Sequence, residues 1–226
     1  MDLTALIPAR GGSKGIPNKN KRIFKGKNLI EWTIRQAQDS DYIDRILVLT
    51  DDLEIAEISK NCGAEIPFIR PDYLATDKSP IMDTVLYTLG QRPELNDLIL
   101  LQPTSPLRRV SDIDNAINLR NIYKRDSVVS VCEISEYPEW MYRVNHNFMT
   151  NYLPEDKLSK RRQDLEKVYI LNGSIYLSTR KHLSENLNFI SKETFPYVME
   201  KKYSVDIDNE IDWNYAELIY DRINHI

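Results

Sequence analysis

The fold is decided by residues 3–15, which read LTALIPARGGSKG. Residues 3–8 form a short apolar run that ends in proline, and such a run is typical of a buried β-strand. Three glycines follow within five residues, and glycine lets the backbone turn sharply and bring its N–H groups close to an anion. Because ligands of open α/β sheets bind beyond the carboxyl ends of the strands, this stretch predicts a first strand that ends in an anion-binding loop.

Outward from this stretch, short runs rich in Ile, Leu and Val alternate with segments of helical period. We expect strands at residues 3–8, 45–50, 66–69, 97–102, 127–132 and 173–178. We expect helices at residues 29–38, 53–61, 79–89, 111–124 and 210–223, with Ser79 and Ser111 as helix caps. The alternation indicates βαβ units, so the predicted fold class is α/β with a mostly parallel sheet.

Residues 134–167 interrupt the alternation. They are rich in Tyr, Pro, Glu, Lys and Arg and have no clear period, which predicts an excursion from the sheet such as a hairpin arm. The 226 residues suit one large α/β core, and no repeat, low-complexity tract or linker divides them. We therefore expect a single domain over residues 1–226 with an inserted arm at residues 134–170.

The composition excludes several classes of protein. Hydrophobic residues make up 42% and charged residues 28%, as in ordinary globular proteins. The formal net charge of -4 argues against nucleic acid as a partner, since proteins that bind the phosphate backbone carry a basic excess. Cys62 and Cys132 have no disulfide or metal-ligand spacing, and no apolar run reaches membrane-spanning length. We expect a cytoplasmic protein with no membrane partner.

Positive charge is concentrated around the glycine-rich loop. Between Ala9 and Ile30 there are seven basic side chains and no acidic one. In a chain of net negative charge, this asymmetry predicts a site for a polyanion such as a triphosphate, with Arg10 and Lys14 beside the glycines. The loop matches neither the Walker pattern nor the GxGxxG of dinucleotide folds. The alternative is a surface loop whose charges are merely solvated.

A second polar loop follows the predicted strand at residues 97–102. Gln102 offers a donor and an acceptor to a sugar, and the guanidinium of Arg108 suits a carboxylate or a phosphate. The alternative is a structural turn in which Arg108 makes a surface ion pair. Residues 161–163 and 172–176 are open to two readings, because they could tie the arm to a ligand or form a simple turn.

The segment Ser204-Val205-Asp206-Ile207-Asp208 alternates like a strand, which directs both aspartates to one side. Two neighbouring carboxylates repel each other unless a cation lies nearby, and their oxygens suit Mg²⁺ that is bound jointly with phosphates. The segment therefore predicts a magnesium site. The alternative is that Asp208 caps the final helix.

Taken in order, these segments resemble the acylneuraminate cytidylyltransferases, the family that makes CMP-sialic acid and its bacterial relatives. The matching segments cover nearly the whole chain, at residues 7–15, 19–20, 70–71, 74–75, 101–108, 162–163, 172–176 and 206–208. The resemblance implies a doubly wound, glycosyltransferase-A-like nucleotidyltransferase sheet. It also implies a homodimer in which the arm at residues 134–170 reaches into the second subunit.

The resemblance further implies a transfer of CMP from CTP to the anomeric hydroxyl of a nine-carbon acidic sugar, with Mg²⁺ as cofactor. At the matching positions, the residues that bind CTP are Arg10, Gly11, Gly12, Ser13, Lys14, Asn20 and Arg70. Those that bind the sugar are Gln102, Arg162 and Tyr176. The magnesium ligands are Asp206 and Asp208, and the catalytic set is Arg10, Lys14 and Asp208.

The sequence departs from the family pattern at two places. Ile170 stands where many relatives have Arg, so the cross-subunit cation of those relatives is missing there, and residues 76–81 differ from members that use serine near the base. N-acetylneuraminate is the sugar expected first, with legionaminate and pseudaminate as alternatives. Other classes that remain open are a nucleotidyltransferase acting on a sugar 1-phosphate, a glycosyltransferase, and a non-catalytic nucleotide-binding regulator.

Overall fold

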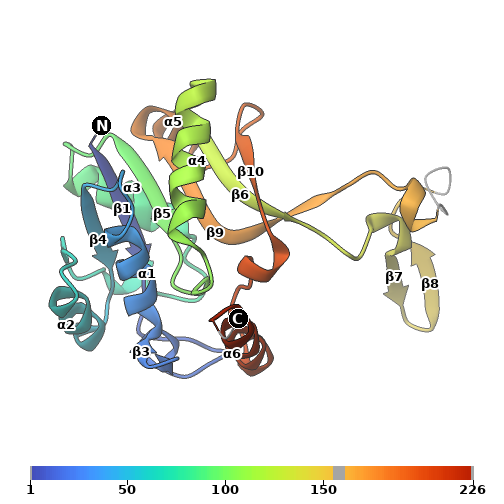
Figure 1. Ribbon diagram of the computed structural model, residues 1–226, viewed down its shortest axis with the longest axis horizontal. Coiled ribbons are helices and arrows are strands. Elements are labelled where there is room, and N and C mark those ends of the chain that lie inside the picture. The colour runs from blue at the N-terminus through green and yellow to red at the C-terminus, as the bar shows by residue number, and fades with distance from the viewer. Residues whose placement is uncertain (1, 155–160, 225–226) are drawn as a thin grey trace.

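The structure is a computed structural model that describes residues 2–154 and 161–224. Its centre is a six-stranded sheet in the order β10-β6-β9-β5-β1-β4 (Figure 1). The strands are β1 (Leu3–Pro8), β4 (Arg45–Leu49), β5 (Asp97–Leu101), β6 (Ser127–Glu133), β9 (Tyr169–Thr179) and β10 (Phe195–Met199). Only β9 runs antiparallel to its neighbours β5 and β6, so the predicted mostly parallel α/β sheet is confirmed.

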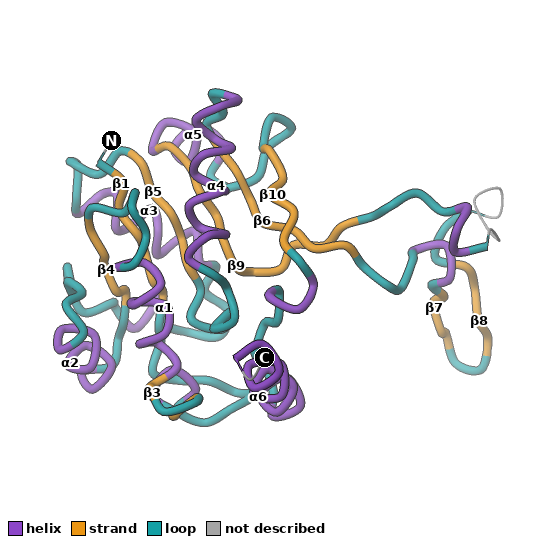
Figure 2. The backbone as a smooth tube through the Cα atoms, in the orientation of Figure 1, coloured by secondary structure: helices purple, strands orange, loops and turns teal. Residues whose placement is uncertain are grey.

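Helices cover both faces of this sheet, which makes it doubly wound (Figure 2). On one face, α1 (Leu29–Gln38), α2 (Leu53–Asn61) and α4 (Val110–Tyr123) pack on the first core cluster. On the other face, α3 (Ile81–Gln91) and α5 (Arg180–Asn186) pack on the second. The alternation along β1 explains this, since Ala5 and Ile7 belong to the first cluster while Leu6 belongs to the second.

A third core cluster fixes the region beyond the carboxyl end of β1. It joins the short hairpin β2 (Ile23–Phe24) and β3 (Lys27–Asn28) to the last helix, α6 (Glu210–Asn224). The rings of Phe24 and Trp213 meet edge to face with centroids 5.5 Å apart. Ile16 and Ile207 are fully buried in the same cluster, so the glycine-rich loop and the aspartate segment are held against one another.

The arm leaves the sheet where β6 ends and returns where β9 begins, with Ile134 and Val168 still joined by a backbone hydrogen bond of 3.1 Å. Its hairpin of β7 (Tyr142–Asn145) and β8 (Phe148–Asn151) lies well away from the body of the molecule, at the right of Figure 1. Val144, Phe148 and Met149 are exposed on this hairpin. A role of the arm in dimerisation stays a prediction.

Three local predictions were wrong. The strand expected at residues 66–69 is reduced to single bridges at Glu65 and Ile69, because Pro67 interrupts it and has no N–H to donate. Helix α3 starts at Ile81 after Pro80, and no side chain caps it. Helix α4 starts one residue before Ser111, and the Asp112 carboxylate accepts the Arg109 backbone N–H at 3.1 Å.

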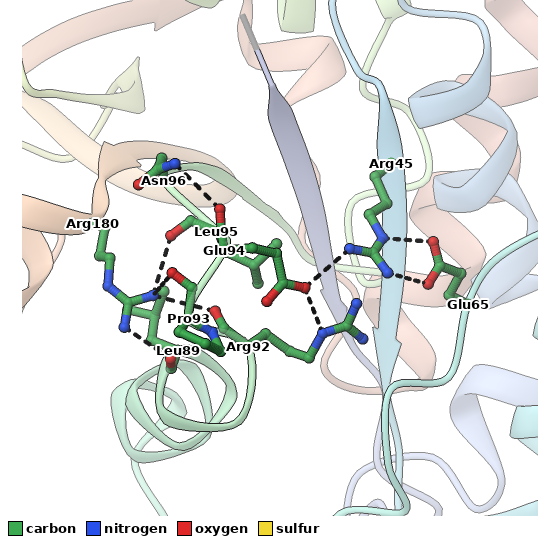
Figure 3. Close-up of polar contacts among 9 residues, drawn as sticks. All are labelled: Arg45, Glu65, Leu89, Arg92, Pro93, Glu94, Leu95, Asn96 and Arg180. Carbon is green, nitrogen blue, oxygen red and sulfur yellow. Dashed lines mark hydrogen bonds and ion pairs between the residues drawn. The ribbon is translucent and has the colours of Figure 1, made fainter.

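Charged side chains near the start of β4 are satisfied by their neighbours (Figure 3). Arg45 makes two hydrogen bonds of 2.6 Å to Glu65 and a longer contact to Glu94. Arg180 donates to the carbonyl oxygens of Leu89, Arg92, Pro93 and Leu95. These contacts hold neighbouring segments of the chain together. In the described part of the chain, no helix has the length and apolar character needed to cross a bilayer.

Candidate functional site

Two adjoining pockets lie beyond the carboxyl ends of β1 and β5, and both are lined by Pro8 and Arg10. The Arg70 pocket has a volume of about 240 Å³, and its other lining residues are Arg70, Thr76, Asp77, Ser79, Ile81 and Thr84. The Asp208 pocket has a volume of about 190 Å³, and its other lining residues are Gly12, Ser13, Lys19, Asn20, Gln102, Pro103, Thr104 and Asp208. The structure thus brings together residues of the glycine-rich loop, the loop after β5 and the aspartate segment.

The glycine-rich loop is held by hydrogen bonds rather than left flexible. Gly11 donates its N–H to the Asp51 carboxylate at 3.1 Å, and the Asn20 amide donates to the Arg10 carbonyl at 2.9 Å. Asn20 therefore has a structural role in the loop, and its contact with the nucleotide stays a prediction. The alternative of a merely solvated surface loop does not fit this bracing.

The glycines of the loop serve different purposes. A Cβ at Gly15 would come within 1.9 Å of the Asp208 carbonyl oxygen, and one at Gly11 within 2.7 Å of Asp52 Oδ2. A Cβ at Gly12 would meet nothing within 4 Å, and Gly12 lines the Asp208 pocket. Close packing therefore requires glycine at two of the three positions, whereas the sequence suggested access for an anion at all of them.

Most of the basic side chains around the loop have acidic partners from distant segments. Lys21, Arg22 and Lys25 pair with carboxylates of α2 or α6, or with the residue before α2. These cations stabilise the fold and do not form part of the predicted polyanion site. Arg10 and Lys19 line the pockets, whereas Lys14 lines neither of them and reaches the first pocket only through its contact with Asp77.

Arg10 and Lys14 share one carboxylate. Arg10 Nη1 lies 2.7 Å from Asp77 Oδ1, and Lys14 Nζ lies 2.8 Å from Asp77 Oδ2. The Asp77 carboxylate, itself an oxyanion, thus bridges the two cations that the sequence predicts to bind phosphate. Their geometry therefore suits an oxyanion ligand.

Arg70 is the buried cation of the first pocket. The residue is 5% exposed, and its Nε has no hydrogen-bond partner among the described residues. Burial lowers the pKa of Arg70, and the neighbouring Arg10 lowers it further. A buried guanidinium without a full set of acceptors is costly, and an anionic or acceptor-rich ligand in the pocket would relieve that cost.

The aspartate segment does not form a regular strand, but its apolar residues are buried in turn, as the predicted alternation requires. Val205 and Ile207 are buried in the third core cluster, and Ile207 donates its N–H to the Thr104 carbonyl at 2.8 Å. Asn172 pins the segment from the other side through a hydrogen bond of 2.9 Å to the Ser204 hydroxyl. The two aspartates therefore lie beside the loop after β5.

Asp206 and Asp208 differ in their surroundings. Oδ1 of Asp206 is buried and has no hydrogen-bond partner among the described residues, whereas the Asp208 side chain is 75% exposed. Burial raises the pKa of Asp206, and the nearby Asp208 carboxylate raises it further. Helix α6 is capped by Asn209, which accepts from the N–H groups of Ile211 and Asp212, so the alternative role of Asp208 as a cap was wrong.

Arg108 takes neither of the roles considered for it. It is 2% exposed and donates to the Ser174 carbonyl, the Thr33 hydroxyl and the Gln36 side-chain oxygen at 2.6, 3.1 and 2.9 Å. It makes no ion pair with the described residues and does not line either pocket. Arg108 therefore joins β9 to α1 in the interior of the molecule.

The three residues predicted to contact the sugar lie in three different parts of the structure. Gln102 lines the Asp208 pocket. Tyr176 is partly buried and packs against the second core cluster, with its ring centroid 5.6 Å from that of Phe189, and it lines neither pocket. Arg162 begins a short 3-10 turn in the arm, and its side chain lies outside the described part of the structure.

Sequence reasoning missed two residues of the site. Lys19 is 9% exposed and its Nζ contacts the Ile207 carbonyl at 2.6 Å and Asp208 Oδ1 at 3.3 Å. Its place in the family motif was the available signal. Asp77 had no signal in the sequence, because its contacts are made across 63 residues or more of chain.

Comparisons with known proteins show the family of the chain. Residues 4–225 match the family described as Cytidylyltransferase. The chain is 38% identical to the CMP-N,N'-diacetyllegionaminic acid synthase of Legionella pneumophila, over 96% of this chain and 95% of that enzyme. It is 32% identical to the N-acylneuraminate cytidylyltransferase of Escherichia coli, over 98% of this chain and 53% of that enzyme, so it spans about half of that longer relative.

A solved structure supports the fold. The CMP:2-keto-3-deoxy-manno-octonic acid synthetase complexed with CTP superposes with a TM-score of 0.73, over 99% of this chain and all of that one. The sequence identity is 16%, so this likeness concerns the arrangement of the elements alone.

Proposed function

The chain belongs to the cytidylyltransferase family, and from that premise we propose that it transfers CMP from CTP to the anomeric hydroxyl of a nine-carbon acidic sugar. The observation that carries the proposal is the pair of adjoining pockets that share Arg10. Arg70 lines the first pocket, and Lys19 and Asp208 line the second. This arrangement suits a nucleoside triphosphate that lies across both pockets, with its phosphates near Arg10 and Lys14.

The aspartate pair fits Mg²⁺, which we propose as the cofactor. Oδ1 of Asp206 has no hydrogen-bond partner among the described residues and can therefore serve as a metal ligand, and Asp208 supplies a second carboxylate. No group of three or more acidic, His or Cys side chains that could hold a metal ion occurs among the described residues. Such a sparse protein ligand set is the usual one for Mg²⁺, whose other ligands are phosphate oxygens and water. When bound, Mg²⁺ neutralises phosphate charge.

The reaction would join the anomeric oxygen of the sugar to the α-phosphorus as the bond to the α,β-bridging oxygen breaks, so that pyrophosphate leaves and the hydroxyl proton is released to water. Positioning and charge stabilisation supply most of the catalysis in such transfers. Arg10 and Lys14 would stabilise the charge that builds on the leaving pyrophosphate. Lys19 would hold Asp208 in place, since its ammonium contacts both that carboxylate and the preceding carbonyl.

The acceptor sugar is the finer part of the proposal. N-acetylneuraminate was expected first, but the relative matched over 95% of its length is named for diacetyllegionaminate. That likeness supports a legionaminate-type sugar as the second candidate acceptor, beside N-acetylneuraminate.

Pyrophosphate release with CTP and each of N-acetylneuraminate, diacetyllegionaminate and pseudaminate tests the function and ranks the sugars. We expect release with at least one of the three. Arg10→Ala serves as the control for the phosphate loop and should lower the rate and weaken CTP binding. Binding of CTP without release for every sugar would instead favour a non-catalytic nucleotide-binding regulator.

We further propose a cytoplasmic homodimer in which the arm at residues 134–170 contacts the second subunit. The exposed Val144, Phe148 and Met149 support this, because apolar side chains gathered on a projecting hairpin mark an interaction surface. A mass measurement in solution at micromolar concentration tests it, and a monomer would contradict it.

A further inference from the structure

Asp77 is presented to the phosphate-binding cations at the tip of a tight turn. The turn is closed by a hydrogen bond of 3.2 Å from the Ser79 N–H to the Thr76 carbonyl, which places Asp77 between them. The Ser79 hydroxyl donates to the Tyr73 carbonyl at 2.7 Å and accepts from the Thr76 hydroxyl at 2.7 Å. The turn therefore has its own internal bracing and does not depend on the ion pairs of Asp77.

The contact of Asp77 with the cations is divided between its two oxygens. Oδ1 meets Arg10 at 2.7 Å and Oδ2 meets Lys14 at 2.8 Å. The side chains of Arg10 and Asp77 are 32% and 37% exposed, and that of Lys14 is 79% exposed. The pairs are thus partly solvated, and contacts of this kind contribute modestly and exchange readily.

A triphosphate that approaches the same two cations meets the Asp77 carboxylate first. Like charges a few ångströms apart repel each other, so the carboxylate and the phosphates cannot share the two cations without cost. The remainder of the loop lines the Arg70 pocket through Thr76, Ser79 and Ile81. A movement of Asp77 would therefore also change the shape of that pocket.

We propose that Asp77 is a latch that competes with the nucleotide phosphates for Arg10 and Lys14, so that nucleotide binding requires Asp77 to leave them. This inference rests on the proposed function, which assigns those two cations to the phosphates. The latch sets the affinity of the site for polyphosphates. It also couples phosphate binding to the loop that forms one wall of the Arg70 pocket.

The test is the binding of CTP and of inorganic triphosphate, each measured by calorimetry on the full chain without sugar. Asp77→Asn keeps the shape of the side chain and removes its charge, and Asp77→Ser is the second variant. Asp72→Asn is the matched control, because Asp72 is an exposed acid of the same loop that makes no ion pair among the described residues. Thermal unfolding checks that each variant is folded.

We expect both Asp77 variants to bind inorganic triphosphate about fivefold more tightly than the wild type, as the loss of two competing surface pairs implies, with a smaller change for Asp72→Asn. CTP should bind more tightly as well. Equal or weaker binding by folded Asp77 variants, while the wild type binds both ligands, would overturn the latch and leave the proposed function standing. If neither ligand binds any of these proteins, the phosphate site fails and the latch fails with it.

Discussion

Arg108 and Arg70 are both buried near the carboxyl ends of the central strands, yet the chain treats their guanidinium groups differently. Arg108 donates to a carbonyl of β9 and to a hydroxyl and an amide oxygen of α1. The Nε of both residues lacks a partner, but the Arg70 guanidinium makes no hydrogen bond or ion pair at all with the described residues, and it lines a pocket. The number of partners within the chain therefore separates a cation that holds the fold from one that is available to a ligand.

The same contrast applies to carboxylates. Asp112 is fully buried and accepts from Arg109 and from the Tyr197 hydroxyl, so its charge is used within the fold. Asp206 is largely buried with an orphaned oxygen, and its neighbour Asp208 faces the pocket. If the charged groups at the pockets are the functional ones, changes there should reduce activity, and changes at charged groups whose partners lie within the fold should reduce stability.

The largest effect is expected for Asp208→Ala. Loss of this carboxylate should lower kcat on the order of a thousandfold, because charge stabilisation at the phosphates carries most of the catalysis. The fold should be unaffected, since the side chain is 75% exposed. Pyrophosphate release and thermal unfolding measure the two effects.

The control for this change is Glu210→Gln, which removes an exposed carboxylate two residues away that pairs with Arg22 and lines neither pocket. It should keep nearly full activity. Chelation of divalent metal should reduce the wild type to the level of Asp208→Ala. A folded Asp208→Ala enzyme with near-normal, metal-dependent turnover would contradict the metal assignment.

Arg108→Met should lower the free energy of unfolding by about 3 kcal/mol, because it leaves several buried acceptors without a donor. For a chain of this size, the loss corresponds to roughly 6–12 °C in Tm. The KM for CTP should stay close to the wild-type value at a temperature where the variant is folded. A stable Arg108→Met with a raised KM would place Arg108 in the site and break the comparison.

The sequence predicted the features that depend on neighbours in the chain. The apolar run of β1 and the glycines after it define a strand and a loop locally, and the family motif led to Arg10, Arg70 and Asp208. The role of Arg108 could not be predicted, since its partners lie 66–75 residues away. Asp77 is a similar case, because a carboxylate in a turn looks solvated until the fold brings the two cations to it.

Arg70→Met gives the smallest of these effects and tests the comparison directly. If its guanidinium is reserved for the nucleotide, the KM for CTP should rise about thirtyfold, as expected for the loss of a hydrogen bond to a charged group. Tm should change little or rise, because a buried cation that lacks a full set of partners is removed. The KM of Arg70→Lys for CTP should lie between those of the wild type and Arg70→Met, since lysine keeps the charge but not the fork of donors. A loss of stability like that of Arg108→Met, with the KM for CTP unchanged, would mean that Arg70 is a second structural arginine and that its lack of partners among the described residues does not indicate a ligand.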